Sequence, residues 1–273
     1  MKPIRTSQKA LAPAAALLFV LTGVARLAGQ EAAETPNTLS DAEKADGFRL
    51  LFDGASLDEG WSQKGNWEVR DGAIARVKGG GSLVWETEPV PDDFELRFEW
   101  KISEGGNSGV YYRPGQYEYQ ILDNAKHSDG TNPRTSAASL YFAVAPSKDA
   151  TQPVGEWNKA RVVCKGTVIQ HWLNGEKVVD FDYTDERWKA DLERFKNRGG
   201  DVAARGAKLS FQDHGDPVFY RSIRLRALPA DADIAHATVE PAPVPAEALT
   251  KEAAILDRIR KNREAREKAV KGK

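Results

Sequence analysis

Residues 105–127 read GGNSGVYYRPGQYEYQILDNAKH, and this stretch decides the fold. Two runs rich in aromatic and aliphatic residues, Ser108–Arg113 and Tyr117–Asp123, flank the dipeptide Pro114-Gly115. Runs of this kind predict β-strands, and a Pro-Gly pair between them predicts a tight turn. The stretch therefore predicts an antiparallel hairpin that ends in an Asp-Asn loop.

The second strand of this hairpin carries polar groups among its aromatic residues. Side chains on a strand alternate between its two faces, so Glu118 and Gln120 share one face while Tyr117 and Tyr119 share the other. Arg113 closes the neighbouring strand. Carboxylate, amide and guanidinium groups crowded onto aromatic strands suggest a site the size of a sugar. The alternative is an ordinary cross-strand pair of Glu118 with Arg113 on a solvated face.

The rest of the chain continues in short alternating segments. In Phe94–Ile102 large apolar side chains alternate with charged ones, which indicates a strand with one buried and one solvated face. Asp71-Gly72 and Asn174-Gly175 are preferred hairpin dipeptides. Further expected strands cover residues 49–52, 67–70, 73–77, 82–86, 138–144, 160–165, 168–173, 177–181, 208–212 and 218–228. About a dozen short strands without a βαβ rhythm predict an all-β protein, an antiparallel two-sheet sandwich of the jelly-roll type.

Composition divides the chain into five parts. We expect residues 1–29 to be a signal peptide, residues 30–47 a linker and residues 48–228 the jelly-roll domain. Residues 229–250 are rich in Ala and Pro and predict a second linker. Residues 251–273 predict a charged helical tail that is mostly solvated, because it has little apolar area to bury.

The first of these parts has the layout of an export signal. Lys2, Arg5 and Lys9 precede the apolar run Leu11–Val24, which is short for a membrane span. We therefore expect export to the periplasm or the extracellular space, with no stable membrane span after cleavage; the alternative is an uncleaved N-terminal anchor. Cys164 is the only cysteine, so no internal disulfide is expected and the core must supply the stability.

Composition and motifs exclude several classes of function. The formal net charge is -1, with 41% hydrophobic and 29% charged residues, which does not point to a nucleic-acid partner. The spacings of His, Cys and acidic residues match no zinc or calcium motif, and no Gly-x-Ser-x-Gly nucleophile elbow occurs. Three of the four histidines, His127, His171 and His214, fall in or beside expected strands, next to acids or amides.

Several motifs occur in a fixed order along the expected sandwich. They are FRLLFDGASLDEGW at 48–61, NSGVYYR at 107–113, YEYQILDN at 117–124, SLYF at 139–142, GEWN at 155–158, HWLNG at 171–175 and QDHGDPVFYRSIRLR at 212–226. Together they resemble the bacterial 3-keto-disaccharide hydrolase family. The resemblance implies a concanavalin A-like (laminin-G-like) jelly roll that is usually exported and acts on glycosides oxidised to a ketone at C3 of the sugar. It does not explain the expected helical insert at 185–205, which is either a lid over the sugar or plain surface.

Chemistry on a 3-keto sugar makes definite demands on a site. The C3 ketone acidifies the hydrogen at C2, so a base can remove it, the group on C1 leaves by β-elimination, and water adds to the unsaturated sugar. We predict His127 or Glu118 as the base, with Asp123 orienting His127. Arg113, or a divalent metal held by Asp123 and Glu118, would stabilise the enolate oxygen; no cofactor is otherwise expected.

The departing oxygen also needs a proton donor, and the sugar needs partners for its hydroxyls. His214, supported by Asp213, is the expected acid. The residues expected to contact the substrate are Tyr112, Gln120, His171, Trp172 and Gln212.

Two other functions compete with the enzyme. The same fold serves as a non-catalytic carbohydrate-binding module, and a third reading is a surface interaction protein whose tail binds elsewhere. Several titratable groups near the expected site favour the enzyme. A 3-keto disaccharide separates the first two readings, because only the enzyme releases free sugar.

Overall fold

The computed structural model describes residues 1, 35–62 and 65–271. The expected signal peptide, apart from Met1, and residues 30–34 of the expected linker lie outside the described residues. Among the helices that are described, none combines the length and the apolar character needed to cross a membrane.

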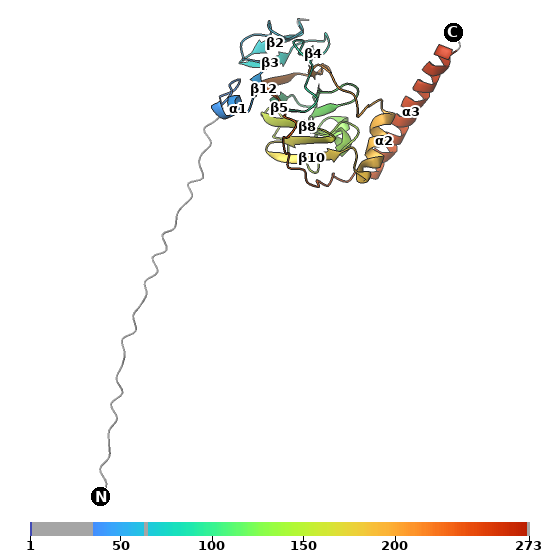
Figure 1. The fold of residues 1–273 in the computed structure, drawn as a ribbon. Helices are drawn as coiled ribbons and strands as arrows, with labels where there is room; N and C mark the ends of the chain where they lie inside the picture. The colour runs from blue at the N-terminus through green and yellow to red at the C-terminus, as the bar shows by residue number, and fades with distance from the viewer. Residues whose placement is uncertain (2–34, 63–64, 272–273) are drawn as a thin grey trace. The chain divides into compact units, whose positions relative to one another are not determined.

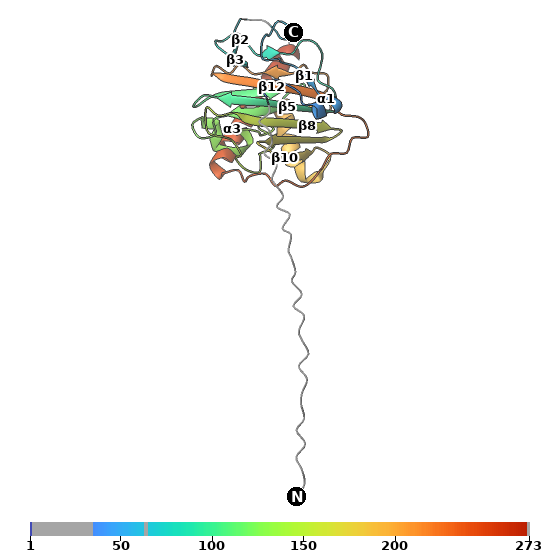
Figure 2. The same ribbon diagram turned by 90° about the vertical axis from the view of Figure 1, so that its left-hand side faces the viewer.

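The described chain folds as two antiparallel β-sheets, which confirms the two-sheet sandwich. The strands of the larger sheet are β1 (Arg49–Leu50), β2 (Trp67–Arg70), β3 (Ala73–Arg76), β5 (Phe94–Ile102), β8 (Asn158–Lys165), β9 (Val168–Leu173), β10 (Glu176–Asp182) and β12 (Val218–Ala227). Their order is β10-β9-β8-β5-β12-β3-β2, with β1 also paired to β12. Figure 2 shows these strands stacked one above the other, with β5 and β12 near the middle.

The smaller sheet carries the hairpin that the sequence singles out. Its strands are β4 (Leu83–Val84), β6 (Asn107–Tyr111), β7 (Glu118–Leu122) and β11 (Ser210–Phe211). The order is β4-β11-β6-β7, so the hairpin β6-β7 forms one edge. The register pairs Tyr111 with Glu118 on one side and with Ser210 on the other. Residues that lie directly opposite each other on neighbouring strands project to the same face of the sheet, so these three side chains share one face.

Aromatic side chains fill the space between the two sheets. Phe98 of β5 meets Tyr119 of β7 edge to face, with ring centroids 5.5 Å apart. Phe211 of β11 and Tyr220 of β12 make the same kind of contact, with ring centroids 4.4 Å apart. Aromatic pairs add to the free energy of apolar burial, and their position shows that Tyr119 and Phe211 point inward. The neighbouring residue Glu118 therefore points away from the core.

The outer face of β5 is polar, as the alternating pattern predicts, but it is not fully solvated. Glu95 is 1% exposed and forms ion pairs with Arg97, Arg161 and Arg226. Burial alone would raise the pKa of Glu95, but these guanidinium groups outweigh it and hold the pKa below its ordinary value. The outer face of β5 thus carries a network of ion pairs between Glu95 and arginine side chains.

Helices occupy the segments around the sandwich. They are α1 (Asp41–Ala45), α2 (Lys189–Asn197), α3 (Ala246–Lys271) and the short 3₁₀ helices η1 (Ser128–Thr131), η2 (Pro133–Thr135) and η3 (Glu186–Trp188). The insert is helical as expected, because Trp188 and Phe195 lie at helical spacing and are both buried.

Residues 138–144 form no strand, contrary to the sequence prediction. Ala138 and Phe142 have positive φ angles of 65° and 62°. A strand needs extended backbone with negative φ, so these residues turn the chain instead. Single bridges from Leu140 to Tyr119 and Val144 are the only ladder contacts that this described segment makes. The segment folds over the edge of β7 and hydrogen-bonds to its backbone, with the Ala138 N–H on the Gln120 carbonyl at 2.8 Å and the Tyr141 N–H on the Glu118 carbonyl at 3.1 Å, but it forms no regular strand.

The C-terminal tail is a mostly solvated helix, as predicted, but one end of that helix is held against the domain. Helix α3 begins at Ala246, five residues before the expected start, and its first turns dock on the domain. Glu252 is 4% exposed and accepts hydrogen bonds from Asn132 and Arg134, each at 2.8 Å. Figure 1 shows α3 running beside α2 and continuing past it. The buried side chains of Glu252 and Ala248 anchor these first turns, whereas most of the described residues from 253 onward are exposed.

Candidate functional site

A chain of hydrogen bonds crosses the outer face of the smaller sheet. The Tyr111 hydroxyl donates to Glu118 Oε2 at 2.9 Å, and Gln212 Nε2 donates to the Tyr111 hydroxyl at 3.1 Å. The three residues come from β7, β6 and the end of β11, which are adjacent strands. The sheet therefore positions a carboxylate, a phenol and an amide in one row, on the face opposite the core.

Glu118 has the electrostatics of a catalytic base. It is 2% exposed, and this burial raises its pKa to about 7. The hydrogen bond from Tyr111 and the charge of Arg198 act in the opposite direction, while the charge of Asp129 raises the pKa further. A carboxyl group with a pKa near neutrality can accept and return a proton at physiological pH.

Gly109 makes the room that this carboxylate needs. A Cβ atom at Gly109 would overlap Glu118 Oε1 and approach Glu118 Cγ and Cδ to 2.9 Å. The backbone of β6 can thus lie directly beneath the carboxylate only because residue 109 has no side chain. This glycine, within the NSGVYYR motif, was not singled out from the sequence.

Three further side chains surround Glu118, and sequence reasoning missed all of them. Arg198 lies with its guanidinium carbon 4.5 Å from the centroid of the Tyr141 ring, and its Nε donates to Gln116 Oε1 at 3.1 Å. The Tyr141 hydroxyl donates to Asp129 Oδ2 at 3.5 Å, and burial raises the pKa of Tyr141 to about 12. The helical insert therefore supplies the cation of the site.

His127 and His214 lie together, as the sequence predicts. Their ring centroids are 6.4 Å apart. His127 Nδ1 accepts a hydrogen bond from the backbone N–H of Asp129 at 3.1 Å, which leaves Nε2 as the atom that carries a proton. His127 is linked to the Glu118 site through Asp129, whose backbone N–H it binds and whose charge raises the pKa of Glu118, and His214 lies beside His127.

Gln120 lies on the same face, but its side chain already forms hydrogen bonds within the protein. It is 1% exposed, and its Nε2 donates to the Thr135 carbonyl at 3.3 Å and to Asn107 Oδ1 at 3.5 Å. Its amide holds the η2 segment against β7. Gln120 therefore supports the floor of the site instead of facing a ligand.

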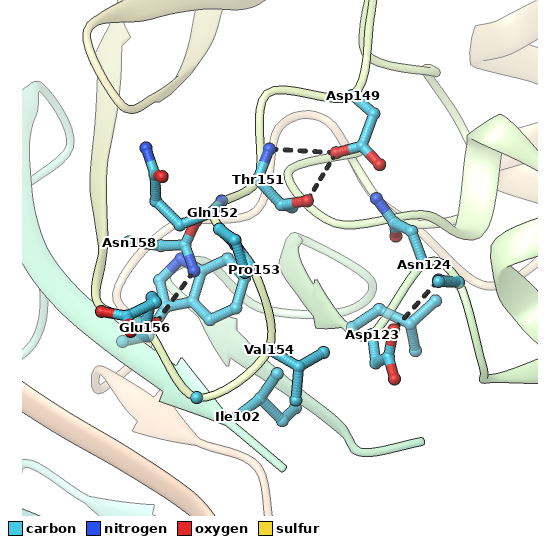
Figure 3. A pocket seen from close by; sticks show the side chains of 14 residues that line it. Ile102, Asp123, Asn124, Asp149, Thr151, Gln152, Pro153, Val154, Glu156 and Asn158 are labelled. Atoms are coloured by element: carbon cyan, nitrogen blue, oxygen red, sulfur yellow. Dashed lines mark hydrogen bonds between the residues drawn. The ribbon is translucent and has the colours of Figure 1, made fainter. Parts of the chain in front are cut away.

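Asp123 does not orient His127, so that part of the prediction is wrong. Its carboxylate accepts hydrogen bonds from the backbone N–H groups of Gly105, Ala125 and Lys126, at 2.7, 3.0 and 3.3 Å. This is the usual role of Asp at the start of a turn. The side chain lines a small cavity of about 130 Å³ beside the 149–158 loop, where Thr151 bonds Asp149 (Figure 3).

A metal held jointly by Asp123 and Glu118 does not fit this arrangement. The oxygens of Asp123 are engaged by backbone donors, and one oxygen of Glu118 is engaged by Tyr111. Among the residues that the structure describes, no three His, Cys, Asp or Glu side chains gather in the manner of a metal site.

Arg113 lies away from Glu118 and cannot serve the same substrate. It is 3% exposed, its Nη2 donates to the Asp92 carbonyl at 2.7 Å, and its guanidinium carbon lies 5.6 Å from the centroid of the inward-facing Tyr117 ring. The strand ends at Tyr111, so simple alternation no longer sets the direction of residue 113. Arg198, and not Arg113 as predicted from the sequence, is the cation that acts on Glu118.

Tyr112, His171 and Trp172 also lie outside the site. His171 is fully buried between the sheets, bonded to the Tyr112 hydroxyl and the Ala138 carbonyl at 2.9 Å each, and burial lowers its pKa to about 4. Trp172 lies on the outer face of the larger sheet, with the guanidinium carbon of Arg161 4.8 Å from its ring. None of these three can touch a sugar held at Glu118.

Asp213 does not support His214 either. It accepts from Arg76 Nε at 2.8 Å and from the backbone N–H groups of Gly80 and Gly81 at 3.0 Å each. Those bonds tie the end of β11 to the glycine-rich loop after β3. Asp213 is a structural tether, and His214 next to it is exposed.

Known proteins are similar to this chain in both sequence and fold. The profile of the 3-keto-α-glucoside-1,2-lyase-like domain matches residues 47–226, nearly the whole sandwich. The chain belongs to this family. A 3-keto-disaccharide hydrolase of Bacteroides thetaiotaomicron is 31% identical over 236 residues, which cover 67% of this chain and 79% of that protein. The family resemblance predicted from the motifs is thereby confirmed.

Solved structures agree with this family assignment. The structure of a candidate glycosyl hydrolase from Parabacteroides distasonis has a TM-score of 0.61 and 29% identity, covering 71% of this chain and 100% of that chain. A second one from the same organism, at 24% identity and a TM-score of 0.54, covers 66% of this chain and 99% of that chain and shows the fold alone. The all-β sandwich expected for the 3-keto-α-glucoside-1,2-lyase-like family is thus confirmed.

Proposed function

We propose that this protein cleaves 3-keto-glycosides, including 3-keto-disaccharides, by elimination followed by hydration. The observation that carries the proposal is the buried Glu118, with a pKa of about 7, hydrogen-bonded to Tyr111 and close to Arg198. The name of the Bacteroides relative and the lyase-like description of the family support the same substrate class.

Glu118 removes the proton from C2 of the oxidised sugar. The electron pair of that C–H bond forms the C2=C3 bond, and the ketone becomes an enolate. The enolate then returns its electrons, the C1–O bond breaks, and the departing oxygen takes a proton to leave as an alcohol. Water adds across the C1=C2 bond of the unsaturated sugar, placing OH on C1 and H on C2. The net reaction is hydrolysis.

The surrounding side chains take complementary roles. Arg198 supplies the positive charge that stabilises the enolate oxygen, a contribution usually among the largest in such reactions. Tyr111 holds the Glu118 carboxylate in place and limits the rise of its pKa. His127 and His214 deliver the proton to the departing oxygen, and Gln212 orients Tyr111.

We also propose that the protein is exported. The proposal rests on the basic residues and the short apolar run at the N-terminus, which match the layout of a signal peptide. Sequencing the N-terminus of the mature protein tests it. A chain that begins near residue 30 supports export, and one that still begins at Met1 contradicts cleavage.

Turnover distinguishes the enzyme from a carbohydrate-binding module. The purified protein is incubated with a nitrophenyl 3-keto-glucoside and with the same glucoside that has not been oxidised. We expect nitrophenol only from the 3-keto compound, because only its C2 hydrogen is acidic. Binding of the 3-keto compound without release of nitrophenol would favour the binding module. Equal release from both compounds would indicate an ordinary glycosidase instead.

A further inference from the structure

A second hollow lies beside the Glu118 site, between the docked part of α3 and the segment that folds over β7. Its volume is about 220 Å³. Its lining includes Asp129, Tyr141, Arg198, Lys251, Glu252 and Arg258. Small-molecule pockets usually measure about 300–1,000 Å³, so this hollow suits one sugar ring or a part of one.

The hollow shares a wall with the Glu118 site. Asp129, Tyr141 and Arg198 line it, and the charges of Asp129 and Arg198 also act on Glu118. The charge of Glu118 in turn raises the pKa of Tyr141. A disaccharide whose oxidised ring lies over Glu118 therefore places its second ring towards the hollow. In a 3-keto disaccharide cleaved at C1 of the oxidised ring, that second ring is the leaving group.

Two of the cationic side chains that line the hollow are not neutralised by an ion pair with another described residue. Glu252 is already paired with Arg134 at 2.8 Å, and Lys251 with Glu247 at 2.9 Å. Arg198 and Arg258 form no ion pair with a carboxylate among the described residues, and Asp129 is the remaining acid in the lining. The hollow thus presents two guanidinium groups, which bind carboxylates and other planar anions in a bidentate manner.

We propose that this hollow is the subsite for the leaving sugar and that it favours a sugar bearing an acidic group, such as a uronate. The inference rests on the proposed function, since it assumes that the oxidised ring lies at Glu118. Arg258 of α3 contacts the anionic group, while Arg198, at the wall that the hollow shares with the Glu118 site, adds positive charge. Arg258 lies outside the matched domain, residues 47–226, so the selectivity belongs to the C-terminal helix of this chain.

The test compares two substrates that differ only in the leaving sugar. One is a 3-keto-glucosyl-glucose and the other is its counterpart with a carboxylate at C6 of the leaving sugar. The full-length protein is assayed beside Arg258→Gln and beside Arg263→Gln. Arg263 lies on the same helix but lines a different groove, next to Asn197. This control removes the same charge from α3 without touching the hollow.

We expect the wild type to prefer the uronate substrate and Arg258→Gln to lose about tenfold to a hundredfold in kcat/KM for it, as for the loss of one charged hydrogen bond. The neutral substrate should be cleaved at nearly the same rate by all three proteins. Equal losses on both substrates, or the same loss in Arg263→Gln, would overturn the subsite.

A binding measurement separates this inference from the proposed function. If the wild type cleaves neither substrate, the hydrolase proposal fails, and titration with glucuronate and with glucose decides the subsite. Tighter binding of glucuronate that disappears in Arg258→Gln supports an anion site in the hollow. Equal affinity for the two sugars, or binding unchanged by Arg258→Gln, overturns it.

Discussion

Replacing Glu118 by glutamine should stabilise the protein, but only at neutral and alkaline pH. The buried carboxyl has a pKa of about 7 in the folded protein, against an ordinary value of 4.5. Folding therefore favours its protonated form. The stability that the protonated group contributes is complete below pH 4.5 and is lost as the pH rises through 7. Glutamine has the same shape and stays neutral at every pH.

The size of the effect follows from the shift of the pKa. A rise from 4.5 to about 7 corresponds to about 3 kcal/mol at one unit per 1.36 kcal/mol. For a domain of this size, about 1 kcal/mol changes the Tm by about 2–4 °C. Glu118→Gln should thus raise the Tm by about 6–12 °C at pH 8 and change it little at pH 4. The same substitution removes the base and should lower kcat by about 10²- to 10⁴-fold.

Thermal unfolding followed by circular dichroism from pH 4 to pH 8 measures this difference. Glu104→Gln, at an exposed position, serves as the matched control and should change the Tm little at either pH. A Tm difference for Glu118→Gln that is the same at pH 4 and pH 8 would refute the reasoning. So would a variant less stable than the wild type at pH 8.

Three further variants examine the geometry around the base. Tyr111→Phe removes a hydrogen bond that lowers the pKa of Glu118, so the pH at which kcat/KM falls on the acid side should move up by about one unit; an unchanged pH profile would contradict this. Gly109→Ala should cut kcat by at least about tenfold because the new methyl group displaces the carboxylate, whereas Gly79→Ala, which meets no backbone, should not. Trp172→Ala should leave KM for the 3-keto substrate unchanged, since that side chain lies on the far sheet; a large rise in KM would restore its predicted role in stacking.

The sequence predicted the sandwich well because its signals are local. Alternation in Phe94–Ile102 and the dipeptides Asp71-Gly72 and Asn174-Gly175 specify strands and turns without reference to distant residues. Residues 138–144 were misread for the opposite reason. Their apolar character serves packing over β7, and the positive φ angles that bend them leave no mark in the pattern of side chains.

The candidate site was predicted only in part, because it is assembled from distant segments. Glu118 was found because its alternation in β7 sets its direction, and the two histidines because they stand beside polar strand ends. Arg198 was missed because nothing in the insert tells which of its cations folds back towards β7. Asp123 was misassigned because its carboxylate serves local backbone donors, which is an equally common use of Asp.

The hydrogen at C2 gives the most direct test of the central claim that Glu118 removes this proton. The 3-keto-glucoside is cleaved in D₂O, and the released 3-keto-glucose is analysed for deuterium at C2, beside samples kept without enzyme. Elimination and hydration predict one deuterium at C2 with the wild type, and with Glu118→Gln cleavage and exchange that are slower by about 10²-fold or more. Product that keeps its original hydrogen at C2, or a Glu118→Gln variant that introduces deuterium at the wild-type rate, would contradict the account.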